Sequence, residues 1–188
     1  MYDNARKIDY ENSANEYWRW VLAAEDLLIA ANILEEKYKN ALTSIIYTQA
    51  GKMPLESQIL AQTIYFKAKS LELFIKGLYI KQGKQVTKNG KFTCKSHDLL
   101  KLCQDTCIAV NPAQKISLKK MTDCIIFWGT YPVPLDYRKW RLDNEGIVGI
   151  QPVFLWSQTD DNSFKEILKQ VRNLVDLKND KNLPWSTT

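Results

Sequence analysis

The chain has 188 residues and a formal net charge of +5, with 45% hydrophobic and 25% charged residues. This composition is typical of a soluble globular protein and argues against disorder, and we treat residues 1–188 as a single domain. No stretch approaches the roughly 18 consecutive apolar residues of a transmembrane helix, and the first residues contain no hydrophobic signal-peptide core. We therefore expect a cytoplasmic protein that does not enter a membrane.

The four cysteines, at positions 94, 103, 107 and 124, are not needed as disulfides in a domain of this size without an export signal. We expect them to be reduced thiols. The chain has only seven glycines and six prolines, and few of its apolar runs alternate with polar residues. These features together predict an all-α fold.

The first helix is predicted to run from Ser13 to about Lys39. Ser13 and Glu16 have the spacing of a capping box, in which each side chain binds the other's backbone N–H group. Residues 41–50 are apolar enough to continue this helix or to form a short separate one.

The stretch from Pro54 to Gly83 is predicted to be one long central helix. Its apolar residues recur every three or four positions and form a wide stripe, so the helix should contact neighbours on more than one side. Pro54 suits the first helical position, and Gly83 suits the left-handed residue just past the end. Glu72 and Lys76 are four residues apart, the spacing of a weak surface ion pair.

Two further segments follow the central helix. The pair Asn89-Gly90 predicts a tight turn or a small hairpin. Ser96 is predicted to cap a third helix, over residues 96–110, and Asn111-Pro112 should end it.

The last third of the chain is predicted to contain two helices separated by a long irregular segment. A fourth helix should span about residues 117–127, and a last helix should span about residues 163–177. Residues 129–161 between them should be the least regular part of the chain, in which residues 147–156 form either a short strand or a segment packed over the bundle. The predicted architecture is an up-and-down bundle of four to five helices, with a long irregular segment before the last helix.

Three pieces of the sequence, in this order, resemble the HEPN domains, a family of helical bundles. They are AKSLELFIKGLYIKQG at 68–83, SHDLLKLC at 96–103 and FWGTYPVP at 127–134. The resemblance covers roughly the middle third of the chain. It implies a four- or five-helix bundle, commonly a homodimer, associated with nucleotide or RNA binding.

Many HEPN proteins are ribonucleases that carry an Arg followed, after four to six residues, by a His. This chain has one histidine, His97, with no Arg at that distance before it, and no His follows Arg138, Arg141 or Arg172. We therefore expect a non-catalytic member without a cofactor. The remaining alternatives are a ribonuclease with an atypical site and a structural, dimerising partner of another enzyme.

The resemblance also implies the kinds of partner that this chain would have. Members of the family act in toxin-antitoxin, defence and RNA-processing systems. Some are non-catalytic partners of nucleotidyltransferases. The expected partners are therefore RNA or a nucleotide, a second copy of the chain, and a nucleotidyltransferase or an antitoxin.

His97 is the one candidate for a catalytic side chain. An imidazole there could act as an acid, a base or an anion contact near neutral pH. The alternative is that His97 supports the helix cap and packs against the preceding loop. His97 also lies near Cys94, Cys103 and Cys107, but the spacing of the four residues matches no zinc motif, and we expect no metal.

The nucleic-acid interface is predicted around the connection that leaves the central helix. Seven lysines there, opposed by Asp98, give a local charge of about +6 that would attract phosphates. These lysines are Lys76, Lys81, Lys84, Lys88, Lys91, Lys95 and Lys101. The predicted binding residues are Lys84, Lys88, Lys91, Lys95, Arg138 and Arg141. The alternative is a solvated, lysine-rich loop whose charge keeps the protein soluble.

An aromatic cluster lies beside the two arginines of this prediction. Tyr131 and Trp140 could stack on bases, as aromatic and guanidinium planes do in RNA-binding proteins, or could contact a protein partner. The alternative is that these rings pack together as a small core.

Overall fold

The computed structural model describes residues 2–45, 56–128, 156–177, 180 and 183. The helices are α1 (Tyr2–Ala14), α2 (Tyr17–Ile45), α3 (Glu56–Lys81), α4 (Leu99–Asp105), α5 (Pro112–Asp123) and α6 (Gln158–Val175). A π-helical stretch, η1 (Cys124–Trp128), continues α5, and β1 (Thr87–Lys88) pairs antiparallel with β2 (Lys91–Phe92). The protein is an all-α helical bundle, as predicted.

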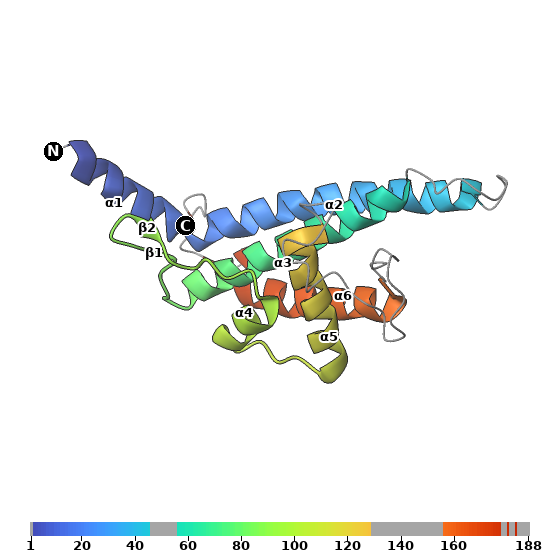
Figure 1. The fold of residues 1–188 in the computed structure, drawn as a ribbon. Coiled ribbons are helices and arrows are strands. Elements are labelled where there is room, and N and C mark those ends of the chain that lie inside the picture. Colours follow the sequence, from blue (N-terminus) through green and yellow to red (C-terminus); the bar gives the residue numbers. More distant parts are fainter. Residues whose placement is uncertain (1, 46–55, 129–155, 178–179, 181–182, 184–188) are drawn as a thin grey trace, which may run out of the picture.

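The central helix of the bundle is α3. It packs along α2 on one side and contacts α4, α5, η1 and α6 on the others, and Figure 1 shows α5 running across the direction of α2 and α3. Leu71, Phe74 and Ile75 of α3 are completely buried. Gly83 lies just past the end of α3 with a φ of 82°, so the predicted central helix and its terminating glycine are confirmed.

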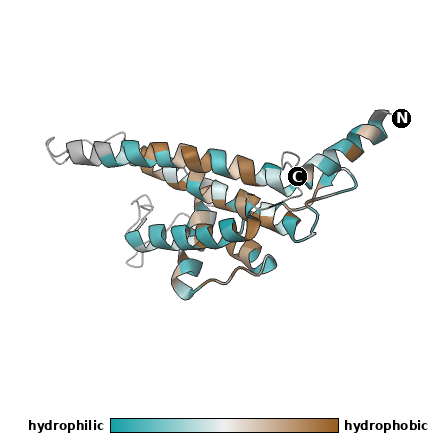
Figure 2. Ribbon diagram, turned by 180° about the vertical axis from the view of Figure 1, so that it is seen from behind, coloured by the Kyte–Doolittle hydropathy of each residue, from teal (hydrophilic) through white to brown (hydrophobic). Residues whose placement is uncertain are grey.

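The distribution of hydrophobic residues follows this packing. Figure 2 shows hydrophobic residues gathered where α2 and α3 run side by side, whereas the side of α6 seen there is mainly hydrophilic. On α6, Phe164, Ile167 and Val171 face the core and are buried. The bundle therefore has one core, arranged around α3.

The start predicted for the first helix is wrong. α1 already begins at Tyr2, Ser13 lies in its last turn, and a separate helix, α2, begins at Tyr17. The chain bends at Asn15, whose side chain accepts a hydrogen bond from the Val86 N–H group at 2.9 Å and donates one to Thr87 Oγ1 at 2.8 Å. These bonds to a distant segment hold the break between the two helices.

The hairpin predicted at Asn89-Gly90 is confirmed. Asn89 has a φ of 54° and Gly90 a φ of 71°, the pair of positive values that a tight two-residue hairpin requires. The Gly90 N–H group donates a hydrogen bond to the Glu11 carboxylate, which ties the hairpin to α1.

The boundaries predicted for the third and fourth helices need correction. α4 is shorter than predicted, because Asp98 rather than Ser96 caps it and the chain leaves the helix at Cys107, whose φ is 59°. The predicted end at Asn111-Pro112 is also wrong, because α4 ends at Asp105 and Asn111 begins α5: its side chain caps that helix and Pro112 occupies the first turn. Proline suits that position because its missing N–H group would have no helical partner.

The last helix also begins earlier than predicted, at Gln158 instead of about Ser163. Ser157 caps it and forms a reciprocal pair of hydrogen bonds with Asp160. The preceding part of the predicted irregular segment, residues 129–155, lies outside the described residues, as do residues 46–50 and Pro54. In the part of the chain that the structure describes, no helix is both long and apolar enough to cross a membrane.

We predict that a bulky side chain at Gly77 will destabilise the bundle. A Cβ atom there would lie 3.0 Å from Val21 Cγ2 and 3.2 Å from the Tyr17 carbonyl oxygen, so the glycine allows α2 and α3 to approach closely. Gly77→Leu should lower the free energy of unfolding by about 2–3 kcal/mol in urea titrations. Gln62→Leu, at an exposed position of α3, is the control and should change it by less than about 0.5 kcal/mol. Equal stability of the two variants would contradict close packing at Gly77.

A second prediction concerns Asp160, which links the start of α6 to α5. Burial raises the pKa of its carboxyl group, but hydrogen bonds from Lys120, Ser157 and Ser117 outweigh burial and lower the pKa from 3.8 to about 2. Because the folded pKa lies below the unfolded one, the ionised carboxylate stabilises the native state above about pH 4. This contribution, about 2 kcal/mol, should disappear as the pH falls from about 4 to about 2.

The measurement is the free energy of unfolding in urea as a function of pH, for the wild type and for Asp160→Asn. The variant cannot titrate at this position, so its stability should fall less steeply below pH 4 than that of the wild type. Parallel curves for the two proteins would contradict the role given to Asp160.

Candidate nucleic-acid interface

The candidate interface is built on a buried carboxylate, Glu72, near the middle of α3. Glu72 is 2% exposed and Lys76, one turn later, is 3% exposed. Glu72 Oε1 lies 2.6 Å from Lys76 Nζ, and Glu72 Oε2 lies 3.0 Å from Lys69 Nζ. The pair whose spacing would make only a weak contact at the surface is therefore a buried ion pair.

The lysines determine the charge state of this carboxylate. Burial alone would raise the pKa of Glu72, but the hydrogen bond and charge of Lys76, together with Lys69, outweigh burial and hold the pKa below its ordinary value. Glu72 is therefore ionised at neutral pH and can only accept hydrogen bonds.

His97 connects this buried carboxylate to the surface. Its Nδ1 atom lies 3.1 Å from both Glu72 oxygens, whereas 47% of its side chain is exposed. Because an ionised carboxylate only accepts, we assign the proton of the neutral ring to Nδ1, which leaves Nε2 as the acceptor. His97 thus does more than support the cap of α4: Glu72 fixes the orientation of its ring.

Aromatic residues and a cysteine surround the ion pair of Glu72 and Lys76. Lys76 Nζ also lies 5.6 Å from the centre of the Phe92 ring, and Phe92 stacks on Trp20 of α2 at 5.8 Å. Cys94 is half-buried nearby, and burial raises the pKa of its thiol although Lys76 acts in the opposite direction. Phe92 of the hairpin therefore covers the Lys76 ammonium group, the partner of the Glu72 carboxylate.

Three of the seven lysines predicted to form the basic region have partners within the fold. Lys76 pairs with Glu72, as described above. Lys81 Nζ donates to the Val175 carbonyl oxygen at 2.8 Å and lies 3.5 Å from Asp180. Lys84 Nζ donates to the Asp105 carbonyl oxygen and lies 4.8 Å from the centre of the Tyr79 ring. These contacts make the surface charge smaller than the sequence suggests.

The other four lysines are exposed but do not all share one environment. Lys88 lines a polar groove of about 550 Å³ between α1 and the hairpin, where Glu11 and Glu16 are also found. Lys91 and Lys95 follow the hairpin turn, and Lys101 lies on the exposed side of α4. Lys91 and Lys95 precede His97 in the sequence, and Lys101 follows it. We call these four exposed residues the basic surface.

The other predicted site residues cannot be placed beside the basic surface. Arg138, Arg141, Tyr131 and Trp140 lie outside the described residues. All four cysteines are free thiols, and burial raises the pKa of Cys103 and of Cys124 to about 12. Among the described residues, no group of three or more His, Cys, Asp and Glu side chains is placed to hold a metal ion.

Sequence reasoning did not identify Glu72 or Lys69 as part of this site. The available signal was a set of charged residues, one turn apart, inside a strongly apolar helix, followed by the only histidine of the sequence. Comparisons with known proteins add no name to the arrangement: no family model, no curated protein and no solved structure matches the chain.

We predict that removal of Glu72 will be costly because it leaves Lys76 buried without its carboxylate. Glu72→Leu should lower the free energy of unfolding by about 3–5 kcal/mol in urea titrations. The double variant Glu72→Leu with Lys76→Met should recover most of that loss, since no unpaired buried charge remains at this site.

The matched control for this prediction is Glu16→Leu, which removes an exposed carboxylate paired with Arg19. It should cost less than about 1 kcal/mol, the usual range for an exposed ion pair. A double variant no more stable than Glu72→Leu would show that the packing of Glu72, rather than its charge, stabilises the site.

Proposed function

We propose that this protein is an HEPN-like helical module that binds single-stranded RNA through the basic surface, without cleaving it. The observation that carries the proposal is the exposure of Lys91, Lys95 and Lys101, on both sides of His97 in the sequence, together with the buried carboxylate that orients the His97 ring. Lysine ammonium groups neutralise phosphates, and a partly exposed imidazole offers a further polar contact. The HEPN resemblance, with its association with RNA, supports the same function.

The acidic residues of the region argue against a larger binding surface. Asp98 caps α4 with its side chain, and Glu11 and Glu16 lie beside Lys88. The surface that can contact phosphates therefore centres on the segment after the hairpin turn. We expect about three phosphate contacts, and hence an affinity that falls with a slope of about −2 when log K is plotted against log salt concentration.

A ribonuclease with an atypical site is the second candidate, and the Glu72–His97 contact is the observation that favours it. A carboxylate that binds Nδ1 leaves Nε2 able to accept a proton, as in the acid–base pairs of many enzymes. Cleavage also needs a group that protonates the leaving oxygen, and the sequence has no second histidine. Binding without cleavage is therefore the preferred conclusion. A nucleotidyltransferase or antitoxin partner stays a prediction from the resemblance.

The test is a fluorescence-anisotropy titration with a labelled single-stranded RNA at several salt concentrations. Replacing Lys91, Lys95 and Lys101 with glutamate should weaken binding at low salt by at least about tenfold, because three phosphate contacts become repulsive. The wild-type slope with salt should be about −2. No binding of wild-type protein at low salt would disprove the proposal.

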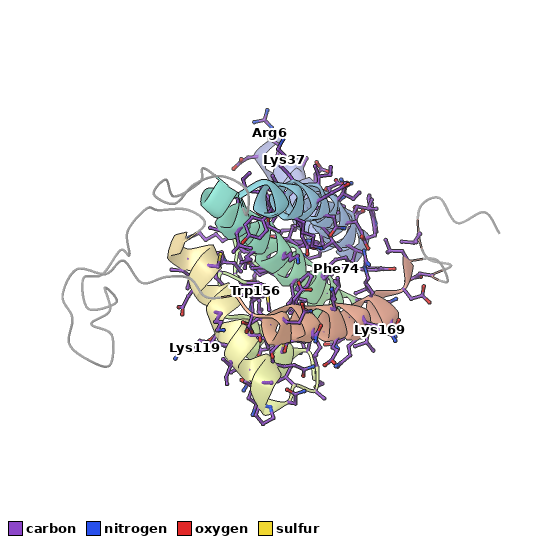
Figure 3. The ribbon with its side chains drawn as sticks, turned by 90° about the vertical axis from the view of Figure 1, so that its right-hand side faces the viewer. Arg6, Lys37, Phe74, Lys119, Trp156 and Lys169 are labelled. Atoms are coloured by element: carbon purple, nitrogen blue, oxygen red, sulfur yellow. The ribbon has the colours of Figure 1, made fainter. Side chains whose placement is uncertain are left out.

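The control is a second triple charge reversal at Lys37, Lys119 and Lys169, which lie on α2, α5 and α6 (Figure 3). It changes the net charge by the same amount, so it should retain most of the affinity. An equal loss in both variants would mean that net charge alone attracts RNA.

Gel analysis of the same samples tests the second candidate: cleavage by the wild type that His97→Ala abolishes would establish a ribonuclease.

A further inference from the structure

The outward face of α2 has an unusual pattern for a solvent-exposed helix. The inward face packs on α3 through Val21, Ala24, Leu28 and Ala31, all of which are buried. On the opposite face, Leu22, Ile29 and Ile33 are 42%, 57% and 63% exposed. Single exposed apolar side chains are ordinary on protein surfaces, so the arrangement of these three decides what they mean.

These residues lie on one line along the helix. Six exposed or partly exposed positions follow each other at spacings of three, four, three, four and three residues: Arg19, Leu22, Asp26, Ile29, Ile33 and Glu36. This is the heptad spacing that keeps one seam of a helix facing a second helix over several turns. We call these six residues the α2 seam.

The α2 seam is complementary to itself in one orientation. In an antiparallel pair of α2 helices, Arg19 of each copy faces Glu36 of the other, and Leu22 faces Ile33. Asp26 then faces Ile29. A parallel pair would instead place Arg19, Asp26 and Glu36 each against its own copy, and like charges in direct contact are repulsive.

The fold leaves the α2 seam accessible among the described residues. Figure 1 shows α3, α5 and α6 all below α2, and α2 packs mainly on α3, with α1 at its start. Arg19 binds Glu16 and lies 4.7 Å from the Trp18 ring centre, but it is 52% exposed. An exposed pair of this kind contributes little, so Arg19 can exchange Glu16 for another carboxylate.

We propose that two copies of this chain form an antiparallel homodimer through the α2 seam, with the two-fold axis crossing α2 midway between Asp26 and Ile29. The three apolar residues of each copy are removed from water, and Arg19–Glu36 pairs close both ends. Asp26 lowers the affinity but fixes the register, as a single polar residue does in a coiled coil. This interface is independent of the proposed RNA-binding surface.

Sedimentation velocity over the micromolar range tests the dimer, and charge exchange tests its geometry. Arg19→Glu and Glu36→Arg should each weaken the dimer by at least about tenfold, since both place like charges at the two ends. The double variant should dimerise again. A mixture of the two single variants should form a heterodimer, because glutamate at position 19 then faces arginine at position 36 at one end, and native Glu36 faces native Arg19 at the other.

A second pair of variants separates this interface from any other. Leu22→Glu with Ile29→Glu should give a monomer, whereas Ile116→Glu, at an equally exposed position of α5, should leave the dimer intact. Asp26→Leu should strengthen association. A monomeric wild type would overturn the proposal and mean that the α2 seam is free or covered by the chain itself. A dimer that survives both the charge reversals and the Leu22 and Ile29 variant would overturn it in favour of a different interface.

Discussion

The enclosure of most of the circumference of α3 is the constraint on which the rest of the structure depends. A helix in that position must bury its polar side chains as well as its apolar ones, and α3 carries Lys67, Glu72 and Lys76 at 4% exposure or less. An unpaired charge in such a place would be strongly destabilising, so each charged group needs a partner, either on α3 itself or on a neighbouring element. For Lys67 the surrounding helices supply those partners, whereas Glu72 and Lys76 pair with each other on α3.

Two ion-pair groups meet this requirement on different sides of α3. Lys67 Nζ lies 2.8 Å from Glu35 of α2 and 2.8 Å from Asp161 of α6, so one ammonium group joins three helices. Burial raises the pKa of Glu35 and of Asp161, but the hydrogen bond and charge of Lys67 contribute to holding both below their ordinary values. The ion pairs of Lys67 with Glu35 and with Asp161 thereby link residues that are far apart in the sequence.

The second group, around Glu72, connects the core to the surface. Its carboxylate has two lysine partners on its own helix, and His97 completes it from the segment before α4. The position of the exposed imidazole therefore follows from the packing of α3 and does not depend on the conformation of a loop alone. A surface residue held in this way loses little freedom when it contacts a ligand.

Much of the fold could be predicted because the signals are local. The apolar spacing of α3 and the Asn89-Gly90 turn are each encoded within a few residues. The break at Asn15 could not be predicted, because the groups that hold it, on Val86 and Thr87, lie about seventy residues away. The burial of Glu72 and Lys76 is also a property of what packs over them, and their spacing alone is equally suited to an exposed pair.

The buried ion pairs also determine how the helices are rotated. Because α3 is apolar around much of its circumference, hydrophobic burial alone gives it no single inward face. We infer that the buried charges remove this freedom, since only one rotation of α3 brings Lys67 to Glu35 and Asp161 while Glu72 faces His97. Glu35 lies on the same inward face of α2 as Ala24, Leu28 and Ala31, so its contact with Lys67 and the apolar packing favour the same rotation of α2. The line that carries Leu22, Ile29 and Ile33 then faces away from the core, so the exposure of that face follows from the apolar packing of α2 and its ion pair together.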